Sequence, residues 1–216
     1  MTRQQLKENA KQQIKGNIGI LFLITLIVAA LSALCSAIPV VGSLAGAIVL
    51  APALSLAMIN IYLDLAKGIK PEIAKLFENF KDFWIAFKTT FFVGLFTGLW
   101  SLLFVIPGII KGIAYSQAMY IVAENPDIGA LEAIDRSKQM MDGHKMDFFV
   151  LILSFIGWNL LATLTFGILY IWLIPYMTAT LTNFYNSIKP AAPIAEAVAE
   201  PAAEFATETV VDVTAE

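Results

Sequence analysis

Residues 143–185 read GHKMDFFVLILSFIGWNLLATLTFGILYIWLIPYMTATLTNFY. The segment opens with the basic pair His144 and Lys145, and the residues that follow carry a single charge, Asp147. About 20 apolar residues are needed to cross the hydrocarbon core of a bilayer. The segment is long enough for two crossings and is interrupted only at Thr165–Gly167. It therefore predicts two spans, about 146–165 and 167–187, joined by a tight turn as a membrane hairpin.

The composition of the whole chain agrees with this interpretation. Its 216 residues are 58% hydrophobic and 14% charged, and the mean hydropathy is +0.75. Soluble domains carry about 25% charged residues. The shortage of charge, together with the long apolar runs, places the chain in the class of membrane proteins. The single cysteine, Cys35, cannot form an internal disulfide, so cysteine usage does not indicate a redox compartment.

Two further hairpins precede this one. The first is predicted from spans at 17–38 and 43–66, and the second from spans at 88–106 and 109–123 with a turn at Pro107-Gly108. We interpret 17–38 as a span because it is longer than the 7–15 apolar residues of a secretory signal. The prediction is an all-α fold, a six-span helical membrane protein built as three helical hairpins.

Polar or amphipathic segments lie between the hairpins, at about 2–15, 71–87 and 127–142. The second has the clearest pattern, because an aromatic-rich face lies opposite a charged face. Such a helix suits the plane of the membrane interface, although a helix packed on a soluble core has the same pattern. We therefore expect amphipathic helices on the cytoplasmic face, within a membrane domain that covers residues 1–189.

The distribution of charge predicts the orientation. The three turn regions contain one base, Lys111, and no acid, whereas the other Lys and Arg residues lie in the segments between the hairpins or near the chain ends. Basic segments stay preferentially in the cytoplasm. The prediction is a multi-pass protein of the cytoplasmic (inner or plasma) membrane with both termini in the cytoplasm.

The last segment, 190–216, differs from the rest. It is rich in Ala, Pro and Glu and contains six acids and no base, so it is predicted to be a disordered acidic tail. Its acids recur at every fourth residue and would form one repelling stripe in a helix. We favour a solvated extension, with a partner-binding tail as the alternative. The acids are Glu196, Glu200, Glu204, Glu208, Asp212 and Glu216.

The sequence contains little that indicates catalysis. His144 is the only histidine, and its place beside Gly143 and Lys145 suggests a position near the lipid headgroups. The carboxylates that could act in pairs lie on or beside a segment that reads as a solvated helix, and no Gly-rich phosphate loop is present. We therefore predict that the protein is not an enzyme, with no catalytic residues, metal, cofactor or nucleic-acid partner.

Polar residues inside the predicted spans are the candidate contacts for a ligand or lipid: Lys111, Gln117 and Asn159. Lys111 either extends to the membrane surface or faces the interior and meets an anionic lipid or solute. Gln117 and Asn159 suit hydrogen bonds between helices. Pro52 and Pro175 are candidate helix kinks at matching places in returning spans, which is a pointer to a transporter site but also common in membrane helices.

Several segments resemble a bacterial family catalogued as domain of unknown function 975. They are QLKENAKQQIKGN at 5–17, VIPGIIKGIAYSQAMYI at 105–121 and, most specifically, ENPDIGALEAIDRSKQMMDGHKMDFF at 124–149. The resemblance covers residues 3–187 and implies a multi-pass bacterial membrane protein without an agreed activity. The layout is also distantly similar to the membrane domain attached to some glycerophosphodiester phosphodiesterases, whose catalytic domain has no counterpart here.

Three functions follow as hypotheses. The first is a non-enzymatic membrane or envelope factor that binds lipid or a protein partner, its expected partners being the lipid bilayer, an anionic lipid and further copies of the chain as a homo-oligomer. The second is a small transporter or channel for a solute or lipid, which a water-filled cavity lined by Lys111, Gln117 and Asn159 would favour. The third is an enzyme whose site the sequence does not reveal, and it ranks last.

Overall fold

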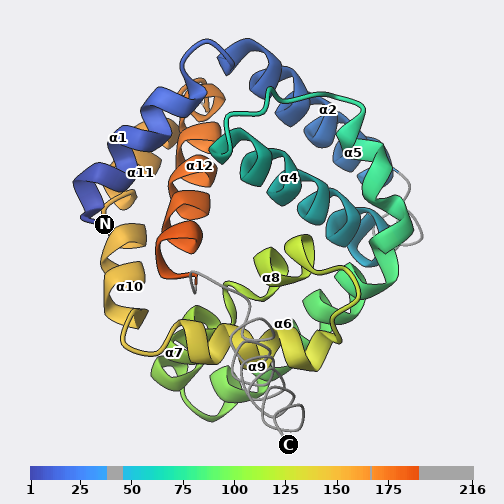
Figure 1. Ribbon diagram of the computed structural model, residues 1–216, viewed down its shortest axis with the longest axis vertical. Coiled ribbons are helices and arrows are strands. Elements are labelled where there is room, and N and C mark those ends of the chain that lie inside the picture. Colours follow the sequence, from blue (N-terminus) through green and yellow to red (C-terminus); the bar gives the residue numbers. More distant parts are fainter. Residues whose placement is uncertain (38–45, 166, 190–216) are drawn as a thin grey trace, which may run out of the picture.

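The computed structural model describes residues 1–37, 46–165 and 167–189, and within these ranges the regular structure is helical (Figure 1). The predictions for 38–45, Phe166 and the tail at 190–216 lie outside the described residues. The elements are α1 (Arg3–Ile14), α2 (Ile18–Ser36), the π-helix η1 (Gly46–Leu50), α4 (Ala51–Ala66), α5 (Lys75–Glu78), the 3-10 helix η2 (Asn79–Asp82), α6 (Phe83–Leu103), α7 (Val105–Tyr115), α8 (Ala118–Glu124), α9 (Ala130–Met140), α10 (Lys145–Leu153), α11 (Ile156–Leu164) and α12 (Tyr170–Ile188).

The prediction of an all-α fold is confirmed. Five helical segments of the described chain are long and apolar enough to cross a membrane: Ile18–Cys35, Ile48–Ala66, Phe83–Leu103, Val105–Glu124 and Lys145–Leu164. The sixth predicted span corresponds to α12, whose second half carries polar residues such as Thr182 and Asn183. The six-span hairpin layout therefore stays a prediction.

Helix α12 is central to the packing. It contacts α1, α2, α4 and α11, and Figure 1 shows it between α1 and α4. Its buried side chains belong to two apolar clusters, because Tyr176 packs with α1, α2 and α4 while Tyr185 packs with α4, α8 and α9. The polar half of α12 is thus shielded by other helices, and Thr180 and Thr182 are fully buried.

The N-terminal helix α1 begins with a capping box, in which Thr2 and Gln5 each bond the other's backbone N–H. Its apolar stripe, Leu6, Ala10 and Ile14, is buried in the cluster that contains α12. Two reciprocal hydrogen bonds of 3.0 Å join the side-chain amides of Gln13 and Asn183 on α12. The stripe therefore attaches α1 to the bundle and leaves its polar sides exposed.

The range 71–87 is not one helix. Residues 71–74 precede α5, and the rest is divided among α5, η2 and the first turns of α6. Leu76 is fully buried, whereas Phe77 and Trp84 are 53% and 60% exposed. Part of the aromatic face is therefore exposed at the surface, while Leu76 packs against the protein, and the position of this segment at the interface stays a prediction.

The turn of the second hairpin is at Phe104, in extended backbone conformation, and not at Pro107-Gly108 as the sequence suggested. Pro107 lies in the first turn of α7, where a missing N–H does not remove a helical hydrogen bond. Gly108 packs against α6 so closely that a Cβ atom there would be 2.7 Å from the Cα of Ser101. Pro107 therefore belongs to the start of a helix, and Gly108 allows α6 and α7 to pack closely, so neither residue forms the turn.

Glycines in the left-handed conformation follow α4 and α9. Gly68, which follows α4, has φ of +83°, and Gly143, which follows α9, has φ of +78°. Glycine adopts this left-handed conformation without the steric cost of a side chain, which is why it commonly follows a helix. Helix α9, from the 127–142 segment, packs on α6, α7 and α8 through Ala133, Ile134 and Ser137.

Candidate functional site

Lys111 lies on α7, near the end of the second hairpin. Its Nζ is 4.9 Å from the ring centroid of Trp100 on α6, which is a cation–π contact. The surrounding hairpin end is apolar and exposed at Leu103, Phe104 and Ile106. Lys111 therefore faces an aromatic ring rather than a carboxylate, and its role as a lipid contact stays a prediction.

Gln117 lies at a break in the fourth predicted span, between α7 and α8. The Ser137 hydroxyl on α9 bridges this break, since it donates to the Ala114 carbonyl at 2.7 Å and accepts from the Gln117 N–H at 3.2 Å. The Gln117 side chain donates to Ser116 at 2.7 Å, while its Oε1 is buried without a described partner. The break is thus held by a serine from a helix that the sequence placed at the interface.

Asn159 lies on α11, which follows a second break at Ser154–Phe155. Its amide donates to the Phe155 carbonyl at 2.9 Å and approaches the sulfur of Met177 on α12 at 3.7 Å. No described contact joins Lys111, Gln117 and Asn159 to one another. The structure thus does not bring the three predicted candidates together.

The two candidate kink residues differ in position. Pro52 is at the start of α4, directly after the π-helix η1, and Pro175 lies inside α12. Both are buried. The clear interruptions of helical spans are instead at Ser116-Gln117 and Ser154-Phe155, where short polar side chains bond backbone carbonyls. Serine competes with helical hydrogen bonding in this way, but the signal is too weak to locate a break from sequence.

A polar pocket of about 830 Å³ lies between the ends of α4, α8, α9 and α12. Its charged and histidine side chains are Asp64, Lys67, Glu124, Arg136, Asp142, His144 and Lys189. None of Lys111, Gln117 and Asn159 is among its lining residues. The pocket combines residues that are far apart in the sequence.

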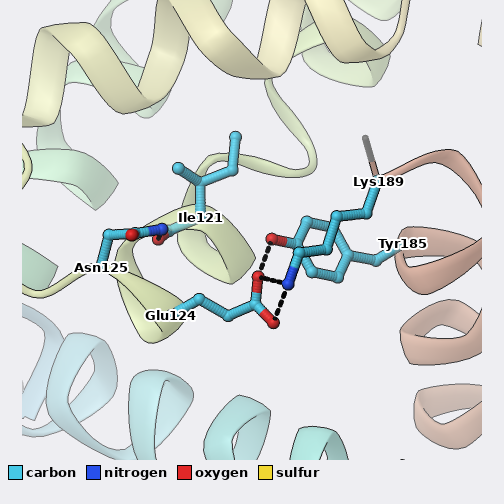
Figure 2. Close-up of polar contacts among 5 residues, drawn as sticks. All are labelled: Ile121, Glu124, Asn125, Tyr185 and Lys189. Atoms are coloured by element: carbon cyan, nitrogen blue, oxygen red, sulfur yellow. Dashed lines mark hydrogen bonds and ion pairs between the residues drawn. The ribbon is translucent and has the colours of Figure 1, made fainter. Parts of the chain in front are cut away.

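Glu124 is the most enclosed of these charges, with a side chain that is 13% exposed. Its carboxylate accepts a hydrogen bond of 2.6 Å from the Tyr185 hydroxyl and lies 2.6 Å from the Lys189 ammonium, and both contacts are drawn in Figure 2. The adjacent Asn125 amide donates to the Ile121 carbonyl at 3.3 Å and covers the end of α8. These contacts fix the last turn of α12 against α8.

The other acids of the pocket are also paired. Asp64 accepts a hydrogen bond from Lys75, and this bond raises the pKa of Lys75. Asp142 lies 3.3 Å from Lys145. Lys67 is exposed and forms no ion pair with any described residue. Paired acids beside one unpaired base suit binding of a polar or anionic group better than proton transfer.

Helix α1 and its C-cap residue, Lys15, present a second cationic feature, which we call the α1 basic face: Arg3, Lys7, Lys11 and Lys15. The spacing of four residues places these bases along one side of the helix. Within the described chain none of them forms an ion pair. Burial lowers the pKa of Lys7, and the positive charges of Lys11 and Arg3 lower it further. The face is therefore a concentration of positive charge without a described counter-charge.

Aromatic rings lie directly beside this face. The Lys7 Nζ is 4.5 Å from the ring centroid of Phe155, and the Lys11 Nζ is 5.8 Å from that of Tyr176. Tyr176 stacks on Trp172 at 4.8 Å, and Trp172 contacts Trp158 at 6.3 Å. Trp and Tyr concentrate at the level of the lipid headgroups in membrane proteins. The combination of bases and tryptophans is typical of a headgroup contact.

The α1 basic face was not among the residues selected from the sequence, although its four-residue spacing is visible there. Its pairing with aromatic rings was not visible, because Phe155 and Tyr176 follow far along the chain. Among the described residues, no group of three or more His, Cys, Asp or Glu side chains is arranged to hold a metal ion.

Comparisons with known proteins give one match. Residues 1–111 and 102–192 match the family described as "Protein of unknown function (DUF975)". No curated protein and no solved structure matched the chain. The matched residues extend over nearly all of the chain up to the acidic tail, and this chain therefore belongs to the DUF975 family.

Proposed function

We propose that this protein is a non-enzymatic membrane factor that binds anionic lipid headgroups through the α1 basic face. The observation that carries the proposal is the position of the Lys7 and Lys11 ammonium groups over Phe155 and Tyr176 without a described carboxylate partner. A phosphate group would supply the missing negative charge.

The physical basis is the attraction of bases to anionic leaflets. Each Lys or Arg near such a surface contributes about 1 kcal/mol to binding. Arg3, Lys11 and Lys15 are exposed, and Lys7 is half-buried, so the face is accessible to a headgroup. The neighbouring tryptophans, Trp158 and Trp172, suit the interface between headgroups and acyl chains.

The proposal includes a cytoplasmic position for both termini in the cytoplasmic membrane. Support comes from the concentration of bases outside the predicted turn regions and from the apolar surface of the hairpin ends. Single cysteines placed at the exposed positions 70 and 127, in a Cys35→Ser background, should react with an impermeant maleimide only from the cytoplasmic side. Reaction from the opposite side would reject this orientation.

The test of lipid binding compares two double variants. Lys7→Gln with Lys11→Gln removes two bases of the α1 face, and this should lower retention of phosphatidylglycerol about thirtyfold, from about 1 kcal/mol for each base. Lys70→Gln with Lys81→Gln removes the same charge from exposed positions elsewhere. Native mass spectrometry measures the retained lipid. Equal losses in the two variants would contradict a specific role for α1.

A small transporter or channel is the second candidate, supported by two interrupted spans and the polar pocket. The breaks at Ser116-Gln117 and Ser154-Phe155 resemble the discontinuous helices of transporter sites. The pocket around Glu124 would then serve as the cytoplasmic vestibule. Proteoliposomes that release a trapped anionic dye or small organic solute only when they contain the protein would support it, and Glu124→Gln should change that release.

A further inference from the structure

The sequence that follows Lys189 matches the α1 basic face in both charge and spacing. The bases of the α1 basic face are residues 3, 7, 11 and 15, and acids occur after Lys189 at residues 196, 200, 204, 208, 212 and 216. In both segments the repeat is four residues.

The C-terminal end of α12 lies close to α1, so the acidic sequence that follows Lys189 begins near the α1 basic face. Asn183, near the end of α12, donates to the Leu6 carbonyl at 3.5 Å and bonds Gln13, both on α1. Only six helical residues, about 9 Å, separate Asn183 from Lys189. The Glu124–Lys189 ion pair holds this end of α12 against α8. The acidic sequence therefore starts close to α1, and the seven residues to Glu196 extend at most about 24 Å.

We infer that the acidic tail, residues 190–216, docks on the α1 basic face and competes there with anionic lipid. This inference rests on the proposed function, because it takes the same face as the lipid site. Ion pairs at an exposed surface are individually weak and are screened by salt. An anionic lipid surface therefore displaces the tail from the α1 basic face. Lipid binding then requires more anionic lipid than it would without the tail.

The size of the effect follows from tethering. A segment joined by a short linker reaches an effective concentration in the mM range, so a contact with mM affinity would mask the face about half of the time. Removal of the tail should then raise phosphatidylglycerol retention about two- to threefold at low ionic strength. At high salt the full chain and the truncated chain should bind equally.

The experiment treats the full chain in detergent with a carbodiimide. This reagent activates a carboxylate, and a lysine amine in contact with it then forms an amide bond while the reagent leaves as a urea. Mass spectrometry should find cross-links between Lys7, Lys11 or Lys15 and the tail acids, and these should disappear on addition of phosphatidylglycerol. A variant with all six tail acids changed to Gln or Asn should show no such cross-links. It should also retain two- to threefold more lipid.

The outcomes separate this inference from the proposed function. Cross-links from the tail only to Lys70 or Lys81, or unchanged lipid retention in the neutral-tail variant, would overturn tail docking while leaving lipid binding by α1 intact. Tail cross-links to α1 in a protein whose lipid retention is insensitive to Lys7→Gln with Lys11→Gln would overturn the proposed function, and with it the competition.

Discussion

Replacement of Ser137 by alanine tests how the break between α7 and α8 is held. The Ser137 hydroxyl is fully buried and serves the Ala114 carbonyl and the Gln117 N–H, for which the described chain offers no other hydrogen-bond partner. Each buried backbone group left without a partner costs about 1–3 kcal/mol. The two groups together should lower the free energy of unfolding by about 2–6 kcal/mol, because little water reaches them.

Thermal unfolding of the detergent-solubilised protein, followed by tryptophan fluorescence, measures this loss. For a chain of this size each kcal/mol corresponds to about 2–4 °C, so Ser137→Ala should lower the midpoint by about 4–24 °C. The control is Ser154→Ala, because Ser154 is exposed and bonds only Leu151 of its own helix. It should change stability by less than about 0.5 kcal/mol. Equal midpoints for the two variants would refute the bridging role of Ser137.

Three further predictions concern the charged contacts. Tyr185→Phe removes the hydrogen bond to Glu124 and should cost about 1.5–3 kcal/mol, measured in the same thermal assay. Because the pKa of Lys7 is lowered in the folded state, the folded protein loses this proton at a lower pH than the unfolded chain, whose lysine titrates near 10.5. Between these two pKa values phosphatidylglycerol retention should fall as the pH rises, while the folded state gains stability relative to the unfolded state. Lys7→Arg keeps its charge and should retain the lipid to higher pH. Lys111→Gln should reduce the number of retained anionic lipids in native mass spectrometry, and an unchanged number would leave only the contact with Trp100.

Much of the local structure could be predicted because it depends on neighbouring residues. The stripe of Leu6, Ala10 and Ile14 is buried as its spacing predicts, and Gly68 and Gly143 follow helices in the left-handed conformation that glycine favours. Such signals lie within one or two helical turns. These signals are sufficient to predict the helical class. They are not sufficient to predict the number of membrane crossings, because neighbouring helices shield the polar residues of α12 and the sequence does not show this packing.

The pocket and the helix breaks were not predictable in the same way. Glu124 meets Lys189 across 65 residues, and Ser137 meets Gln117 from a separate helix. Neither pairing leaves a periodic pattern in the sequence, because each depends on how the helices cross. The turn predicted at Pro107 was wrong because the sequence signal is ambiguous: proline is as compatible with the first turn of a helix as with a loop.

The close contact between Gly108 and Ser101 has a consequence for how the protein is assembled. Gly112 reinforces it, because a Cβ atom there would be 3.3 Å from the methyl group of Thr97. All four residues lie within 97–112, so this contact is complete as soon as α7 has been synthesised. Helices α6 and α7 can therefore pair while the chain is still emerging from the ribosome and enter the bilayer as one preassembled unit, before α12 exists to organise the remaining helices.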